Sequence, residues 1–193
     1  MADLITRKRE ARAELIAARD ALDPAVRREL DGRIIERFTD LVTYRYAGLL
    51  LLYCPNGSEI DVLPLEEAAL RDGKRVAYPR CGKNRTMTFF EVGSHAELEA
   101  GSFGLREPGE GAKAVDPSDL SSAAVIIPAL CWDEGFRRIG YGGGYYDRWL
   151  PGFPGSRVGF CYSSFMRRSL PVGRFDCVCD VIVTEKGVKT RDV

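Results

Sequence analysis

The chain has 193 residues, 45% of them hydrophobic, so it is long enough to bury the core of one enzyme-sized domain. Its 28 basic and 28 acidic residues cancel, which argues against a nucleic-acid-binding protein that works through bulk positive charge. The longest apolar runs, at 47–52 and 123–130, are too short to cross a bilayer, and no apolar run follows the charged amino terminus, so a cytoplasmic protein is expected.

Two amphipathic helices are predicted at the start of the chain, over about residues 3–22 and 24–41. Apolar residues recur at helical spacing through both segments, for example at Leu15 and Leu22 and then at Ile34 and Phe38. Between the segments, Asp23-Pro24 provides an N-cap followed by proline at the first helical position.

A βαβ unit follows these helices. Residues 47–53 are continuously apolar, which is typical of a parallel strand buried on both faces. A helix at 62–71, closed by Gly73, and a strand at 75–79 complete the unit. Further strands are predicted at 86–92, 123–128, 158–162, 181–184 and after Gly187.

The intervening segment 101–115 is rich in glycine, proline and charge, and it is predicted to be a long surface loop. No repeat or linker divides the chain. The elements together predict a single three-layer α/β/α domain over residues 1–193, with a mostly parallel sheet.

The cysteines and the single histidine limit the kinds of metal site and catalytic mechanism that the chain can have. None of the six cysteines forms a Cys-x-x-Cys pair, so buried free thiols are expected, and Cys177 and Cys179 are interpreted as packing residues rather than metal ligands. The single histidine, His95, is predicted to lie in a surface loop or at a helix start. Histidine-rich metal sites are therefore excluded, and any Ser-His-Asp mechanism would depend on this residue alone.

Residues 137–148 contain four glycines, three tyrosines, three arginines and an aspartate. Glycines let backbone N–H groups approach an anion and arginines supply charge for phosphate oxygens, which favours a phosphate-binding loop. A glycine-rich turn packed between strands is the alternative. The P-loop pattern is absent and the dinucleotide pattern lacks its last glycine, so neither common nucleotide fold is favoured. Ligands of open α/β sheets collect beyond the carboxyl ends of strands, and this loop leaves such an end.

The segment from Arg138 to Arg148 resembles the signature of the 5-formyltetrahydrofolate cyclo-ligase family, also called 5,10-methenyltetrahydrofolate synthetases. The resemblance extends over nearly the whole chain. Its other landmarks are Lys8 and Arg12 in the first helix, the strand exit from Tyr53 to Glu59, residues 74–79, residues 105–108 and Asp180.

The resemblance implies an ATP-dependent ligase that converts 5-formyltetrahydrofolate to 5,10-methenyltetrahydrofolate, with magnesium, through a phosphorylated formyl oxygen. ADP and phosphate would be released. The implied fold is akin to that of sugar-phosphate isomerases and CoA transferases. The implied partners are the reduced formyl-folate and ATP, with no nucleic acid or membrane, and the enzyme is expected to be a monomer.

The resemblance also implies roles for individual residues. Tyr145 would lie nearest the formyl group and act with Arg138 in catalysis, and Asp147 and Asp180 would hold the metal. Cys54, Glu59, Phe103 and Tyr145 would border the folate. ATP would contact Lys8, Arg12, Arg138, Gly140, Tyr141, Gly142, Gly143, Gly144, Tyr145 and Tyr146.

Each role has a structural alternative that the sequence leaves open. Lys8 and Arg12 share one helix face, which could be a solvated basic face; Glu59 could be a surface glutamate; Cys54, Phe103 and Tyr145 could be packing residues. Two other functions also remain possible from sequence: a sugar-phosphate isomerase-like enzyme on the related fold, and a sensor that binds nucleotide or folate without turnover.

Overall fold

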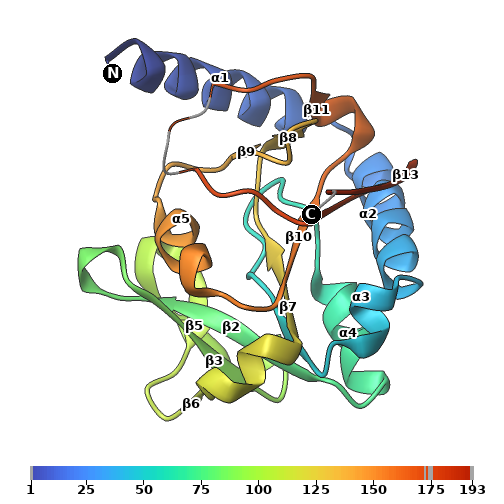
Figure 1. Cartoon of the computed structure of the whole chain (residues 1–193), viewed down its shortest axis with the longest axis vertical. Helices are drawn as coiled ribbons and strands as arrows, with labels where there is room; N and C mark the ends of the chain where they lie inside the picture. Colours follow the sequence, from blue (N-terminus) through green and yellow to red (C-terminus); the bar gives the residue numbers. More distant parts are fainter. Residues whose placement is uncertain (1, 172, 174–175, 192–193) are drawn as a thin grey trace.

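The computed structural model describes residues 2–171, 173 and 176–191, without the side chains of residues 2 and 103. Its centre is an eight-stranded sheet in the order β13-β12-β10-β7-β1-β2-β3-β6 (Figure 1). The bounds are β1 Leu49–Leu51, β2 Arg75–Cys81, β3 Met87–Val92, β6 Lys113–Ala114, β7 Ala123–Ile127, β10 Ser156–Phe160, β12 Val181–Thr184 and β13 Gly187–Thr190. The strands β12, β10, β7, β1 and β2 are parallel, and the outer strands are antiparallel, which confirms the predicted mixed α/β fold with a mostly parallel sheet.

Helices lie on both sides of this sheet. They are α1 Ala2–Asp20, α2 Pro24–Thr39, α3 Val42–Tyr46, α4 Leu63–Arg71 and α5 Tyr145–Trp149. Figure 1 shows α2, α3 and α4 together on one side and α5 on the other, with α1 across one end of the molecule. Short 3₁₀ helices are η1 Lys83–Arg85, η2 His95–Glu97, η3 Ser102–Gly104, η4 Pro117–Ser122, η5 Leu150–Gly152 and η6 Ser163–Phe165.

The core forms where α2 meets the sheet, as the apolar pattern of the sequence predicts. Ile34 and Phe38 of α2 are fully buried, and the Phe38 ring packs edge-on against Phe160 of β10 at 5.3 Å between centroids. The start of α2 is set by the Asp23 side chain, which accepts from the Ala25 backbone N–H at 2.7 Å. Every residue of β1 and β7 is buried, which fits central parallel strands covered on both faces.

The prediction of a long loop at 101–115 is wrong in part. β4 Leu98–Ala100 pairs with β5 Arg106–Pro108 as a two-stranded antiparallel sheet, and β6 joins the edge of the main sheet. Burial of Leu98 anchors this hairpin, while the glycines that suggested a loop lie outside its strands. The segment is thereby held in register beside β2, and β5 is placed where its side chains reach the cavity described below.

A further three-stranded sheet, which the sequence did not predict, supports the glycine-rich segment. It consists of β8 Cys131–Asp133, β9 Arg138–Ile139 and β11 Met166–Arg167, in the order β11-β8-β9. Trp132 of β8 and Ile139 of β9 are buried. The glycines therefore leave a strand whose position is fixed by packing.

Across the described part of the chain, no helix combines the length and the apolar character that a membrane span requires.

Candidate active site

A cavity of about 560 Å³ opens beyond the carboxyl ends of the parallel strands, as the fold class predicts. Its wall combines the chain after β1, the end of β2, the exit of β7, the glycine-rich segment, α1 and β5. The lining residues are Lys8, Arg12, Tyr53, Cys54, Asn56, Glu59, Pro79, Cys81, Met87, Leu105, Arg106, Glu107, Pro128, Arg138, Ile139, Gly140, Tyr141, Gly142, Gly143, Gly144, Tyr145, Tyr146, Asp147 and Asp176.

The glycine-rich segment needs glycine for local reasons. Gly142 and Gly144 have φ of 98° and 71°, in the left-handed region that side chains disfavour. A Cβ on Gly143 would lie 3.0 Å from the Tyr145 ring. Gly142 and Gly143 are exposed, so this turn is part of the cavity wall and is not packed between strands.

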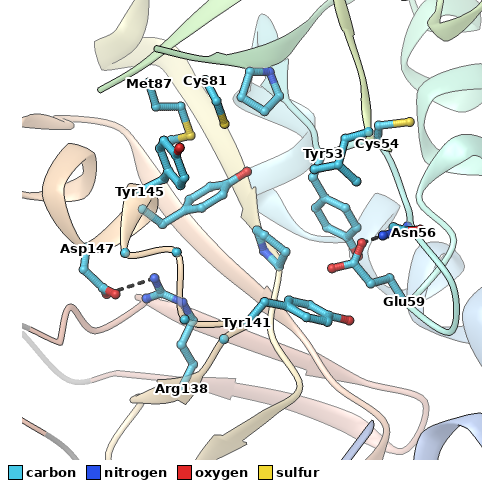
Figure 2. A pocket seen from close by; sticks show the side chains of 18 of the residues that line it. Tyr53, Cys54, Asn56, Glu59, Cys81, Met87, Arg138, Tyr141, Tyr145 and Asp147 are labelled. Atoms are coloured by element: carbon cyan, nitrogen blue, oxygen red, sulfur yellow. Dashed lines mark hydrogen bonds and ion pairs between the residues drawn. The ribbon is translucent and has the colours of Figure 1, made fainter. Parts of the chain in front are cut away.

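One end of the cavity, here called the charged end, contains Lys8, Arg12, Arg138, Asp147 and Asp176. Arg138 is only 7% exposed, and its Nη2 donates to Asp147 Oδ1 at 2.9 Å (Figure 2). The Lys8 ammonium pairs with the Asp176 carboxylate, and Arg12 Nε donates to the Gly140 carbonyl at 2.8 Å. Lys8 and Arg12 thus face the cavity rather than forming a solvated basic face.

Two buried polar atoms at this cavity have no hydrogen-bond partner among the described residues: Arg138 Nη1 and the Tyr146 hydroxyl. Buried polar atoms in folded proteins nearly always have partners, so a ligand with acceptor oxygens fits here. Burial raises the pKa of Tyr146 well above its ordinary value, which keeps the hydroxyl protonated and able to donate.

Tyr145 belongs to a cluster with Cys81 and Glu107 at the end of β2. The Cys81 thiol is hydrogen bonded to both side chains, and burial, helped by the Glu107 charge, raises its pKa to about 11. The Cys81 thiol is therefore a hydrogen-bonding group at neutral pH and not a thiolate nucleophile. Glu107 Oε1 also accepts from the Cys81 backbone N–H at 3.1 Å, which fixes β5 to β2 beside Tyr145.

The opposite end, here called the tyrosine-rich end, contains Tyr53, Cys54, Asn56, Glu59 and Tyr141 (Figure 2). Tyr141, which the resemblance implies as an ATP contact, thus lies beside Glu59. Glu59 Oε2 accepts from the Asn56 backbone N–H at 2.9 Å, and burial raises the Glu59 pKa above its ordinary value. The Tyr53 hydroxyl donates to the Ile60 carbonyl at 2.8 Å, which holds this ring against the wall. The result is one desolvated carboxylate among aromatic rings.

Most residues expected from sequence meet in this cavity, but Asp180, which the resemblance implies as the second metal carboxylate, does not line it. Asp180 directly precedes β12, and its Oδ2 accepts from the Arg157 backbone N–H at 2.9 Å. Asp176, four residues earlier, lines the cavity instead. Phe103 cannot be compared, since its side chain lies outside the described residues.

The other sequence expectations concern residues away from the chemistry. His95 begins η2 outside the cavity, with Nδ1 2.8 Å from Glu66 Oε1. All six cysteines are free thiols, as expected, but only Cys131, Cys161 and Cys179 are buried, and the other three are half-buried. The cavity residues that sequence reasoning missed include Cys81, Arg106, Glu107 and Asp176; the 105–108 landmark indicated Arg106 and Glu107 only as part of a motif.

The donor set fits a metal that takes few protein ligands. Among the described residues, no three His, Cys, Asp or Glu side chains converge to hold a metal by themselves. Magnesium needs only one or two carboxylates when phosphate oxygens and waters complete its shell. Asp147 and Asp176, with Cys177 N donating to Asp147 at 3.4 Å between them, offer two such carboxylates.

Comparisons with known proteins agree on one family. The profile of the 5-formyltetrahydrofolate cyclo-ligase family matches residues 5–185. The 5-formyltetrahydrofolate cyclo-ligase of Escherichia coli K12 is 28% identical over 176 residues, covering 88% of this chain and 96% of that protein. The NMR structure of Aquifex aeolicus 5,10-methenyltetrahydrofolate synthetase matches with a TM-score of 0.83 and 34% identity, covering 96% and 94% of the two chains. The Mycoplasma pneumoniae synthetase, at TM-score 0.74 and 21% identity, shares the fold.

Proposed function

The chain belongs to the 5-formyltetrahydrofolate cyclo-ligase family, and from that premise we propose how its cavity binds ATP and the reduced formyl-folate. The enzyme converts 5-formyltetrahydrofolate to 5,10-methenyltetrahydrofolate, with ATP as co-substrate. The observation that carries the assignment of residues is that the glycine-rich segment, the first helix and the strand exit at Glu59 form one cavity.

The triphosphate is proposed to lie at the charged end. The N–H groups of the exposed glycines, with Lys8, Arg12 and Arg138, are suited to its oxygens. The unpartnered Arg138 Nη1 and Tyr146 hydroxyl support this placement, since both are buried donors that need acceptors.

Asp147 and Asp176 are the residues proposed to hold Mg²⁺. When bound, the ion would neutralise charge on the phosphate oxygens during transfer. Asp147 fixes the Arg138 guanidinium and Asp176 fixes the Lys8 ammonium, so each carboxylate also orients a cation toward the phosphates. Asp180 is left out because its carboxylate is held by Arg157 N and Arg191.

The folate is proposed to lie at the tyrosine-rich end, with Glu59 accepting from ring N–H groups of the pterin and Cys54 at the wall. Phe103 stays a proposed neighbour of the folate on the resemblance alone. Tyr145 would then lie next to the formyl group, with its hydroxyl oriented by Cys81.

The chemistry follows from the leaving group. A formamide oxygen leaves poorly, so its attack on the γ-phosphorus of ATP first converts it to a phosphate ester and releases ADP. The neighbouring folate nitrogen then attacks the formyl carbon, and phosphate leaves as the ring closes. Phosphoryl transfer depends mainly on positioning and charge stabilisation, so this site needs no histidine base. Arg138 and the glycine N–H groups would stabilise the transferring phosphoryl group.

We also propose that the enzyme acts as a cytoplasmic monomer without a nucleic-acid partner, in keeping with its balanced charge. The purified chain, with 5-formyltetrahydrofolate, ATP and Mg²⁺, is expected to generate methenyl absorbance and one ADP per product. Folded protein that binds both ligands without ADP release would indicate a sensor. Turnover of a phosphosugar without ATP would indicate an isomerase-like enzyme.

A further inference from the structure

Arg19 is a buried cation that the site described above does not use. It projects from α1, is 2% exposed, and does not line the cavity. Its Nη1 donates to the Ala129 carbonyl at 2.9 Å, its Nε to Ser58 Oγ at 3.4 Å, and its Nη2 to the Tyr141 hydroxyl. All three acceptors are neutral, and within the described ranges no carboxylate reaches ion-pair distance of Arg19. A buried charge without a counter-charge is costly, so Arg19 is expected to have a role beyond stabilising the fold.

The compensating negative charge acts through Tyr141. The Tyr141 side chain is hydrogen bonded to both Arg19 and Glu59, so the guanidinium donates to the hydroxyl oxygen and the hydroxyl donates to the carboxylate. Such a chain polarises each bond and strengthens the next. Arg19 thus reaches Glu59 from behind the cavity wall.

The surroundings of Glu59 make this contact important. Tyr53, Cys54, Tyr141 and Tyr146 interact electrostatically with the carboxylate, and none of them carries a positive charge. Burial raises the Glu59 pKa, whereas the Asn56 backbone N–H, Arg19 and the Tyr141 hydroxyl lower it. Arg19 is the one positively charged group among the three that lower the Glu59 pKa.

We propose that Arg19 is a positioning residue for the folate, which keeps Glu59 ionised and oriented toward the cavity through the Tyr141 hydroxyl. This inference rests on the proposed function, because it assumes that Glu59 accepts from the pterin. It predicts that Arg19 controls the affinity for the formyl-folate and leaves the affinity for ATP unchanged.

The test uses Arg19→Met and Tyr141→Phe, with Arg9→Met as control because Arg9 is an exposed arginine of the same helix. Affinity for 5-formyltetrahydrofolate without ATP is measured by calorimetry from pH 5 to pH 8, beside KM for both substrates. Both test variants are expected to bind the folate about tenfold more weakly, as for loss of a hydrogen bond to a charged group. Their loss of folate affinity on acidification is expected to begin at higher pH than in the wild type, because Glu59 protonates more readily without Arg19.

A double-mutant cycle separates this role from a structural one. In a Glu59→Gln background, Arg19→Met is expected to cause no further loss of folate affinity, because its effect passes through Glu59. If the losses of folate affinity caused by Arg19→Met and Glu59→Gln multiply in the double variant, the inference is overturned. A rise in KM for ATP as large as the rise in KM for the folate would also overturn it. If Arg19→Met does not fold, Tyr141→Phe decides, since it keeps the bonds of Arg19 to Ser58 and Ala129. An inactive wild type would count against the proposed function, whereas an active wild type with unaffected variants would count against this inference alone.

Discussion

The two ends of the cavity handle charge in opposite ways. At the charged end, Lys8 and Arg138 are each already paired with a carboxylate, so an incoming polyanion must exchange partners with Asp176 and Asp147. At the tyrosine-rich end, Glu59 is a single carboxylate in a desolvated wall, and a neutral hydroxyl connects it to its cation. The charged end is therefore suited to a metal-neutralised phosphate chain, and the tyrosine-rich end to a flat ring with N–H donors. Variants at each end should affect one substrate and not the other.

The largest effect is expected for Asp147→Asn. It removes a proposed metal carboxylate while keeping an oxygen that can accept from Arg138, so turnover should fall about a hundredfold or more. Binding of 5-formyltetrahydrofolate, measured by calorimetry without ATP, should stay close to the wild type. Asp180→Asn is the matched control, because Asp180 lies outside the cavity, and it should retain turnover. Equal loss of turnover and folate binding in Asp147→Asn would indicate a collapsed loop.

Glu59→Gln is expected to have the next largest effect, at the other end. Loss of a charged acceptor for ring N–H groups should raise KM for the folate by about 10- to 100-fold and leave KM for ATP unchanged. The wild type should lose folate affinity as pH falls through the Glu59 pKa, which burial raises, so the loss begins at higher pH than for an ordinary glutamate. Steady-state kinetics across pH should show this acid limb in the wild type and not in Glu59→Gln. A shared rise in both KM values would show that the two ends are not independent.

Lys8→Met should have a smaller effect. It removes one of several cations from the charged end, so KM for ATP should rise about tenfold, while KM for the folate stays unchanged. The melting temperature should change little, because Lys8 faces the cavity and not the hydrophobic core, and methionine keeps most of its apolar stem. Arg9→Met, one residue along the same helix, is the control. An unaltered KM for ATP would separate Lys8 from the phosphates and leave Arg138 and Arg12 as the cations of that end.

The sequence predicted well those parts of the molecule that local patterns determine. Asp23-Pro24 located the start of α2, the apolar run at 123–128 located β7, and the glycines of 137–148 located the loop that lines the cavity. In each case the signal lies within a few residues of the structure it specifies. The family resemblance, which extends over nearly the whole chain, is confirmed by the comparisons.

What the sequence did not reveal depends on contacts between distant segments. Lys8 and Asp176 are 168 residues apart, and nothing local distinguishes Asp176 from Asp180 as the carboxylate that faces the cavity. Arg19 looks like any arginine of an exposed helix until Ala129 and Tyr141 surround it. Cys81 and Glu107 were missed for the same reason. The β4–β5 hairpin brings Glu107 to Cys81, but it lies in a segment with the composition of a loop.

The smallest effect on activity is expected for Asp31→Asn, which tests whether the pH dependence of folate binding arises at Glu59. Asp31 of α2 and Tyr162 form a second buried carboxylate–tyrosine pair outside the cavity, with the Tyr162 hydroxyl 2.6 Å from Asp31 Oδ1. Burial raises the Asp31 pKa from 3.8 to about 6. The folded state therefore holds a proton that the unfolded state releases, so this contribution to stability is complete below pH 3.8 and is lost as pH rises through 6.

Urea unfolding between pH 4 and pH 7 measures this contribution. The wild type should lose about 2–3 kcal/mol more of its unfolding free energy over that range than Asp31→Asn, since one pKa unit corresponds to about 1.4 kcal/mol. The acid limb of folate KM should be the same in both proteins, because Asp31 does not contact the cavity. If the unfolding free energies of the wild type and Asp31→Asn change equally with pH, Asp31 ionises normally in the folded state. A shifted acid limb of folate KM would mean that Glu59 is not its source, and the electrostatic contrast between the two ends of the cavity would then have to extend through the sheet to α2.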